Sequence, residues 1–120
     1  MQRYTDLKVW QRSHDLVLRI YPLTKGLPTD ERFGLQSQLR RAAVSVPTNI
    51  AEGSKRRRPQ DYAHFLNMAE ASLAEVDYLL LLAQDLGYLE DEASQSLRAE
   101  GDEIAAMLHT LRTRVEQGTS

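Results

Sequence analysis

Apolar side chains recur every three or four residues through four stretches of this chain, and glycine or proline separates the stretches. This spacing lines up one face of an α-helix, whereas a half-buried strand alternates at every second residue. We therefore predict helices over about residues 6–24, 30–52, 59–86 and 91–117. Short connections favour antiparallel neighbours, so the expected fold class is all-α, an antiparallel up-and-down left-handed four-helix bundle. The length of 120 residues fits one such domain, covering residues 1–120.

The second, third and fourth predicted helices each carry one apolar stripe for a shared core. The stripes comprise Leu35, Leu39, Ala42, Ala43, Val46 and Ile50; then Tyr62, Phe65, Leu66, Ala69, Leu73, Val76, Leu80 and Ala83; and finally Leu97, Gly101, Ile104, Leu108, Leu111 and Val115. Their spacings of three and four are those of helices that pack lengthwise against one another.

The first predicted helix is apolar on two sides. One stripe holds Leu7, Trp10, His14, Val17 and Tyr21, and the other holds Val9, Leu16, Ile20 and Leu23. Such a helix either lies deep in the bundle or also meets another subunit. We expect Trp10 and Tyr21 to anchor the core, His14 to be a core histidine, and Thr5 and Thr29 to cap the first two helices.

Charge is divided unevenly between the two halves of the chain. Residues 1–58 hold 12 Lys and Arg against 5 Asp and Glu, a net charge of +7, whereas residues 59–120 hold 3 against 12, a net charge of −9. One interpretation is a basic surface for an anionic partner. The other is that the two halves attract each other within one fold, and the sequence leaves both open.

The up-and-down topology sorts these charges between the two ends of the bundle. The cations expected at one end, the basic pole, are Arg3, Lys8, Lys55, Arg56, Arg57, Arg58, Arg112 and Arg114. The carboxylates expected at the other end, the acidic pole, are Asp30, Glu31, Asp85, Glu90, Asp91 and Glu92.

The run Lys55–Arg58, here called the basic turn, is the sharpest local feature. Arginine binds phosphate through paired hydrogen bonds, and Arg40 and Arg41 lie on the helix that leads into this turn. We predict that Arg40, Arg41, Lys55, Arg56, Arg57 and Arg58 bind nucleic acid. A solvated turn that only complements the dipole of the preceding helix is the alternative. The turn offers no element for reading bases, so it predicts no sequence specificity.

The sequence offers little support for an enzyme, a cofactor or a metal. It has no cysteine, which excludes a disulfide framework and thiol chemistry. His14 is expected in the core, and His109 is isolated. His64 stands three residues after Asp61 and could in principle chelate with it, but both lie in the first turn of a predicted helix, where Asp61 is a normal dipole partner. Di-iron bundles need Glu-x-x-His motifs, and this chain has none. We therefore predict no catalytic residue, metal or cofactor, and a metalloenzyme would rest on fold analogy alone.

Other polar residues receive structural interpretations. Asn49 follows Pro47, whose missing N–H frees carbonyls that Asn49 could bond, and Glu52 could pair with a nearby cation. Glu70, Glu75 and Asp77 are expected on a solvated or subunit-facing edge.

No signal peptide is apparent at the start of the chain, and the longest apolar run, Tyr78–Ala83, is too short to span a bilayer. We expect a cytoplasmic protein with no membrane partner.

Several segments together resemble one protein family. They are Asp6–Gln11, Arg32–Leu35, Gln38–Pro47, Asn49–Gly53 and Asp85–Leu89. In these segments the chain is similar to the bacterial four-helix bundle proteins, also called 23S rRNA-intervening sequence proteins. The resemblance covers nearly the whole chain.

The resemblance implies a bundle that assembles into a ring, usually a homopentamer. It also suggests kinship with the accessory variability determinant of diversity-generating retroelements, a basic barrel that binds nucleic acid and a reverse transcriptase. Residue matching would place Arg40, Arg41 and the basic turn on the cationic surface, although the acidic fourth helix departs from that pattern. We expect a homo-oligomer that binds RNA or DNA. The alternative is a protein-interaction scaffold for a nucleic-acid enzyme such as a reverse transcriptase, without direct nucleic-acid contact.

Overall fold

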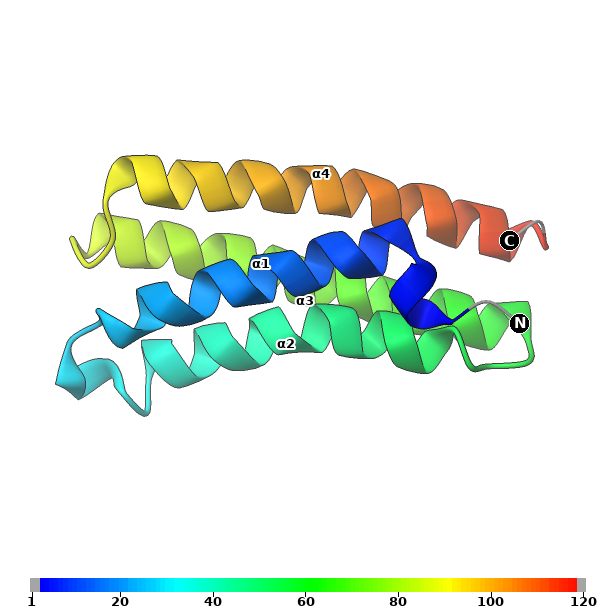
Figure 1. Cartoon of the computed structure of the whole chain (residues 1–120), viewed down its shortest axis with the longest axis horizontal. Helices are drawn as coiled ribbons and strands as arrows, with labels where there is room; N and C mark the ends of the chain where they lie inside the picture. Colours follow the sequence, from blue (N-terminus) through cyan, green and yellow to red (C-terminus); the bar gives the residue numbers. More distant parts are fainter. Residues whose placement is uncertain (1–2, 119–120) are drawn as a thin grey trace.

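The computed structural model describes residues 3–118, which form four long helices and no strand. The elements in chain order are η1 (Tyr4–Asp6), α1 (Lys8–Lys25), η2 (Thr29–Glu31), α2 (Leu35–Gly53), α3 (Pro59–Asp85) and α4 (Asp91–Glu116), where η marks a 3-10 helix. They build an elongated bundle of 45 × 23 × 20 Å (Figure 1). The predicted all-α four-helix bundle is confirmed. None of these helices is long and apolar enough to cross a membrane.

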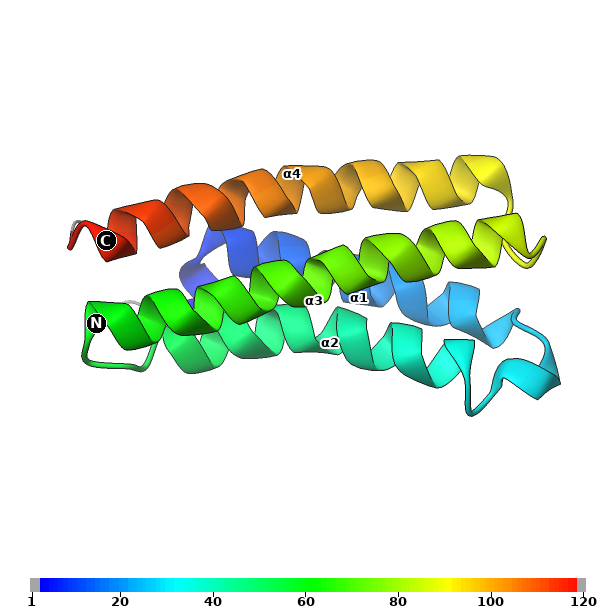
Figure 2. The same ribbon diagram turned by 180° about the vertical axis from the view of Figure 1, so that it is seen from behind.

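Consecutive helices run antiparallel, and each lies beside two others around the bundle. Helix α1 packs against α2 and α4, and α3 packs against the same two from the opposite side (Figures 1 and 2). The α1–α2 and α3–α4 connections therefore lie at one end. The α2–α3 connection lies at the other end, with η1 and the end of α4. This topology is the one that separates a basic pole from an acidic pole.

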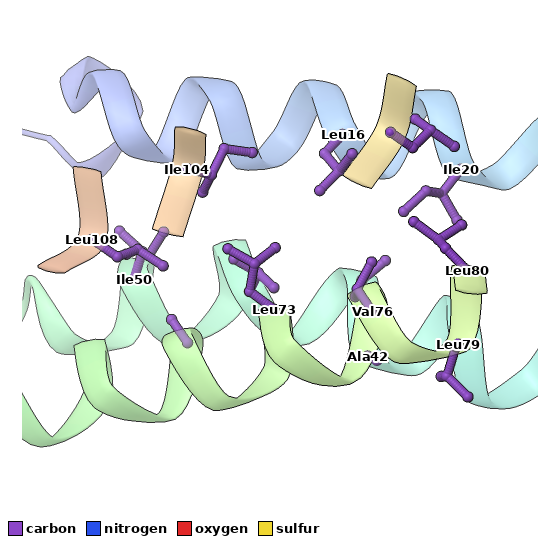
Figure 3. Packing of buried hydrophobic residues seen from close by; sticks show 14 of the residues in the cluster. Leu16, Ile20, Ala42, Ile50, Leu73, Val76, Leu79, Leu80, Ile104 and Leu108 are labelled. Atoms are coloured by element: carbon purple, nitrogen blue, oxygen red, sulfur yellow. The ribbon is translucent and has the colours of Figure 1, made fainter. Parts of the chain in front are cut away.

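The core consists of aliphatic side chains from all four helices. The largest fully buried ones are Leu16, Ile20, Val46, Ile50, Leu66, Val76, Leu80, Ile104, Leu108 and Val115. In Figure 3, Leu16 and Ile20 of α1 point toward Val76 and Leu80 of α3 across the centre of the bundle. Full burial of one such side chain stabilises the fold by about 1.5–3 kcal/mol.

The predicted core stripes are confirmed most fully in α2, where all six residues are buried. In α3, Tyr62 and Phe65 are only half-buried, whereas Ala63 and Leu79 are buried although the prediction omitted them. In α4, Gly101 and Leu111 are only half-buried.

Helix α1 turns mainly one of its two apolar stripes into the core, although Leu23 of that stripe is only half-buried. Val9, Leu16 and Ile20 are buried, whereas Trp10 is half-buried and packs against the edge of the core. The expectation of a core histidine is wrong, because His14 is exposed and its ring stacks on Trp10 at 5.0 Å. Tyr21 is likewise not a core anchor, since 37% of its surface is exposed.

Both predicted threonine caps are wrong, because the first two helices begin later than expected. Thr5 lies within η1, and Leu7 precedes α1 without a capping side chain. Thr29 lies within η2, and α2 begins only at Leu35. A glutamate serves that start instead: Glu31 Oε1 accepts a hydrogen bond from the Leu35 backbone N–H at 3.2 Å. This bond satisfies one of the N–H groups that a helix start leaves without a partner.

Candidate nucleic-acid interface

The basic turn leaves α2 at a point where two helices approach closely. A Cβ atom at Gly53 would lie 2.7 Å from Phe65 Cβ and 3.0 Å from Tyr62 Cδ1, so only glycine allows α2 to end against α3 in this way. Backbone hydrogen bonds then hold the turn, from Lys55 N–H to Glu52 O at 3.2 Å and from Arg56 N–H to Gly53 O at 3.0 Å. The backbone is therefore ordered, while all four side chains of the turn are exposed.

The four cations of the basic turn differ in how they are engaged. Arg58 Nε lies 3.3 Å from Asp61 Oδ2, in an exposed pair of the kind that contributes little to stability. The Arg56 guanidinium lies 4.6 Å from the centre of the Phe65 ring, a cation–π contact that leaves its charge unneutralised. Lys55 and Arg57 make no ion pair with any residue in 3–118. Three exposed positive charges are thus available to an anion.

Other cations of the basic pole add to this turn unequally. Arg3 and Lys55 line the same small hollow of about 330 Å³, so η1 brings a further cation beside the turn. Arg112, by contrast, is held by two carboxylates, Glu70 on α3 and Glu116 one turn along α4. The hydrogen bond to Glu70 raises the pKa of the Arg112 guanidinium. Its charge is balanced internally, so it adds little to the field of the pole.

The structure does not bring Arg40 and Arg41 to the basic turn. Both lie near the start of α2, and the 13 residue steps from Arg40 to Gly53 correspond to about 20 Å of helix. Arg40 Nε donates a hydrogen bond to Thr24 Oγ1 at 2.7 Å, and its guanidinium lies 4.7 Å from the centre of the Tyr21 ring. Arg41 is exposed, and its Nη2 lies 3.5 Å from Ser37 Oγ. The predicted site therefore divides into two surfaces.

The attraction between the two oppositely charged halves is confirmed for some residues. Arg12 pairs with Glu100 at 3.0 Å and with Glu103 at 3.2 Å, and Arg19 lies 3.8 Å from Glu100. These contacts join α1 of the basic half to α4 of the acidic half. The hydrogen bond to Glu100 raises the pKa of Arg12. Within residues 3–118, the cations of the basic turn pair with no carboxylate except for the local contact of Arg58 with Asp61.

A polar hollow lies beside the basic turn and was not predicted from the sequence. It measures about 710 Å³ and lies between the start of α3 and the end of α4. Its lining residues are Pro59, Gln60, Ala63, His64, Asn67, Arg112, Glu116, Gln117 and Gly118. The spacing of Gln60, His64 and Asn67 places them on one face of a helix, and this polar face is the signal that could have revealed the hollow.

Comparison with known proteins identifies the family. Residues 5–110 match the family profile described as 23S rRNA-intervening sequence protein. The chain belongs to the 23S rRNA-intervening sequence protein family.

A solved structure supports this membership of the 23S rRNA-intervening sequence family. It is a crystal structure from Bacteroides thetaiotaomicron VPI-5482, described as a protein with unknown function from the S23 ribosomal protein family. The two folds agree with a TM-score of 0.80 and 27% sequence identity, over 87% of this chain and 97% of the other. No curated protein is similar enough to count as a relative.

In this member of the 23S rRNA-intervening sequence family, the Asn49–Gly53 segment has a structural role. Asn49 Nδ2 donates to the Ser45 carbonyl and to Ser45 Oγ, both at 2.9 Å, and Ser45 Oγ lies 2.8 Å from Ser72 Oγ of α3. Pro47 has no N–H group, so the Ala43 carbonyl lacks its usual helical donor. Asn49 was expected to bond a carbonyl freed in this way, but it bonds the Ser45 carbonyl instead. The expected ion pair of Glu52 is wrong, since Glu52 is exposed and pairs with no residue in 3–118.

The acidic residues of α3 in this family member are mostly paired. Asp77 accepts from Arg98 at 3.0 Å, and Glu70 holds Arg112, whereas Glu75 is exposed. Across the described part of the chain, no three His, Cys, Asp or Glu side chains gather closely enough to hold a metal ion.

Proposed function

We propose that this chain is a cytoplasmic, non-enzymatic homo-oligomer that binds the phosphates of RNA or DNA through the basic turn. The observation that carries the proposal is the set of three exposed cations at Lys55, Arg56 and Arg57, held on an ordered backbone without a carboxylate partner among residues 3–118. Such exposed cations contribute little to the stability of the fold, but each can displace a counterion from a nucleic-acid strand. The contacts would be to phosphate and would not read the base sequence.

The separation of Arg40 and Arg41 from the turn refines this proposal. Arg41 is exposed, but it lines a hollow beside Tyr21 on the face proposed below for contact between copies, so it is left out of the first test. Arg40 is half-buried and serves mainly to hold α2 against α1. The basic turn is therefore the part of the predicted site to test first.

Fluorescence anisotropy with a labelled single-stranded RNA and a labelled DNA of equal length tests the proposal. We expect Arg56→Ala/Arg57→Ala to weaken binding to both by about tenfold, since two charge-assisted contacts are lost. The matched control is Lys25→Ala/Arg32→Ala, which removes the same charge from exposed positions near the acidic pole. Equal losses in the two variants would show that only net charge matters, and no binding at low salt would remove the proposal.

The homo-oligomer rests on an apolar face between α1 and α2. A hollow of about 420 Å³ there is lined by Trp10, His14, Val17 and Pro47 among others, and it adjoins a second of about 410 Å³ beside Tyr21. Val44 lines both hollows and is 38% exposed. Burial of this face against another copy would stabilise an assembly.

A ring of five copies, the number that the family resemblance implies, would repeat the basic turn around one rim and raise affinity through avidity. Light scattering above micromolar concentration tests the assembly. We expect Val44→Asp to yield monomers, while Tyr78→Asp, at a 58% exposed tyrosine of α3, leaves the mass unchanged. A wild-type chain at monomer mass would contradict the assembly without bearing on phosphate binding.

A further inference from the structure

The hollow between the start of α3 and the end of α4 begins where the basic turn ends. Pro59 and Gln60, two of its lining residues, follow Arg58 directly in the chain. We propose that this hollow binds the base of a nucleotide whose phosphate lies on the basic turn. The inference rests on the proposed function, and it adds a ligand class, an unpaired nucleotide, to what is otherwise a phosphate contact.

The three amide side chains in the hollow make no hydrogen bonds within the described residues. The side-chain amides of Gln60, Asn67 and Gln117 line it and make no hydrogen bond with any residue in 3–118. Each amide carries both a donor and an acceptor, the combination that the edges of nucleobases also present. These groups can therefore bond a base without first breaking contacts within the protein.

The size and lining of the hollow also suit a base, which is flat and uncharged. Ala63 is small and buried at the α3 wall, and a volume of about 710 Å³ leaves room for a base with its sugar. His64 is exposed in the same lining, and an imidazole ring offers a face on which a base can stack. The charged liners Arg112 and Glu116 pair with each other at 3.2 Å, and Glu70 also holds Arg112, so the lining presents no unpaired positive charge that would require an anionic ligand.

Access to the hollow favours bases outside a duplex. In a double helix the base faces are stacked and the pairing edges are occupied, and taking a base out costs a few kcal/mol. A base in a single strand, or in a free mononucleotide, enters without that cost. Both sources share the same chemistry, a base linked to a phosphate, and the test below separates them.

Titration of the isotope-labelled full-length chain, followed by NMR of backbone and side-chain amides, uses three probes: inorganic phosphate, adenosine monophosphate and a single-stranded RNA hexamer. We expect phosphate to shift only the signals of the basic turn. The RNA should also shift the side-chain amides of Gln60, Asn67 and Gln117. Shifts of these amides with the monophosphate at equal affinity would identify a free nucleotide as the ligand, and shifts only with the hexamer would identify a strand.

The same titration separates failure of this inference from failure of the proposed function. RNA that shifts the basic turn but leaves the three side-chain amides unmoved overturns the base site and leaves phosphate binding in place. An RNA hexamer that shifts neither region overturns both.

A variant pair completes the test. Because stacking and edge contacts are lost, His64→Ala/Asn67→Ala should weaken single-stranded RNA binding about fivefold or more. Binding of a duplex of the same sequence should not change. Tyr78→Ala/Gln95→Ala, at exposed positions on the same two helices but outside the hollow, should change neither. An equal loss for single strand and duplex in the His64 and Asn67 variant would contradict the base site.

Discussion

Arg40 and Thr24 join α2 to α1 through a side-chain hydrogen bond of 2.7 Å between Arg40 Nε and Thr24 Oγ1. Thr24 is fully buried, and its hydroxyl also donates to the Tyr21 carbonyl at 2.7 Å. Gln36 Nε2 adds a bond of 3.0 Å to the Thr24 carbonyl. Thr24, near the end of α1, therefore holds Arg40 in a structural contact between the two helices, although Arg40 was predicted to bind nucleic acid.

Thr24→Val keeps the volume of the side chain but removes the acceptor for Arg40. We expect the free energy of unfolding to fall by about 1–2 kcal/mol, because a half-buried guanidinium loses its partner. Urea unfolding of Thr24→Val, Arg40→Met and the double variant measures this energy. The two substitutions should not be fully additive, since both remove the bond between Arg40 and Thr24, although Thr24→Val also loses the bond to the Tyr21 carbonyl. Additive losses would mean that Arg40 and Thr24 stabilise the fold separately.

Gly53 and Gly101 are both helical glycines, and their surroundings predict opposite outcomes for alanine. Gly53→Ala would place Cβ 2.7 Å from Phe65 Cβ, so we expect a loss of about 2 kcal/mol or more as α2 and α3 are pushed apart. At Gly101 the nearest atom is Leu73 Cδ1 at 3.7 Å, an ordinary contact. Gly101→Ala should leave stability unchanged or raise it by up to about 1 kcal/mol.

Thermal unfolding of the two glycine variants beside the wild type gives the comparison directly. A Gly53→Ala chain as stable as the wild type would show that the α2–α3 junction relaxes without cost. The close approach would then not determine the path of the basic turn.

Arg112 contacts two glutamates that differ in exposure, so their contributions to the free energy of unfolding should differ. Glu70 is largely buried with Arg112, whereas Glu116 is about half exposed. We expect Glu70→Gln to lower the free energy of unfolding by about 1–2 kcal/mol and Glu116→Gln by less than about 0.5 kcal/mol. Chemical denaturation of both variants tests this difference. Equal effects would contradict a partly buried ion pair between α3 and α4.

Tyr62 should make the free energy of unfolding decrease as the pH becomes alkaline. Burial raises the pKa of its phenol above the usual value of about 10, so the unfolded chain loses this proton first. The contribution is fully present below about pH 10 and is lost as the pH rises through the folded-state pKa. Unfolding measured from pH 9 to 11 should therefore show a shallower decline in Tyr62→Phe than in the wild type. Tyr78→Phe, at an exposed tyrosine, should follow the wild type.

The parts of the fold that could be predicted follow from spacing alone. All six predicted apolar residues of α2 are buried, because a three-to-four residue repeat has only one face that can meet a core. The start of α2 could not be predicted in this way. Thr29 is a good cap by residue type, but Glu31, held also by the Tyr88 hydroxyl at 3.3 Å, caps the later turn at Leu35.

The candidate site shows the same division between local and tertiary information. Exposure of Lys55, Arg56 and Arg57 was predictable, since burying unpaired charge is costly. The separate location of Arg40 was not, because it depends on where the end of α1 meets α2. His14 was misassigned because its apolar neighbours on α1 face the groove beside α2, where the ring stacks on Trp10 and stays exposed.

The salt dependence of RNA binding tests the central claim most directly. Affinity of the wild-type chain for a single-stranded RNA should fall linearly on a plot of log affinity against log salt concentration, because bound cations release counterions. Replacing Arg56 and Arg57 with alanine should reduce the slope by about 0.7 for each phosphate contact removed. A slope that is unchanged by these substitutions would contradict a phosphate-binding role for the basic turn.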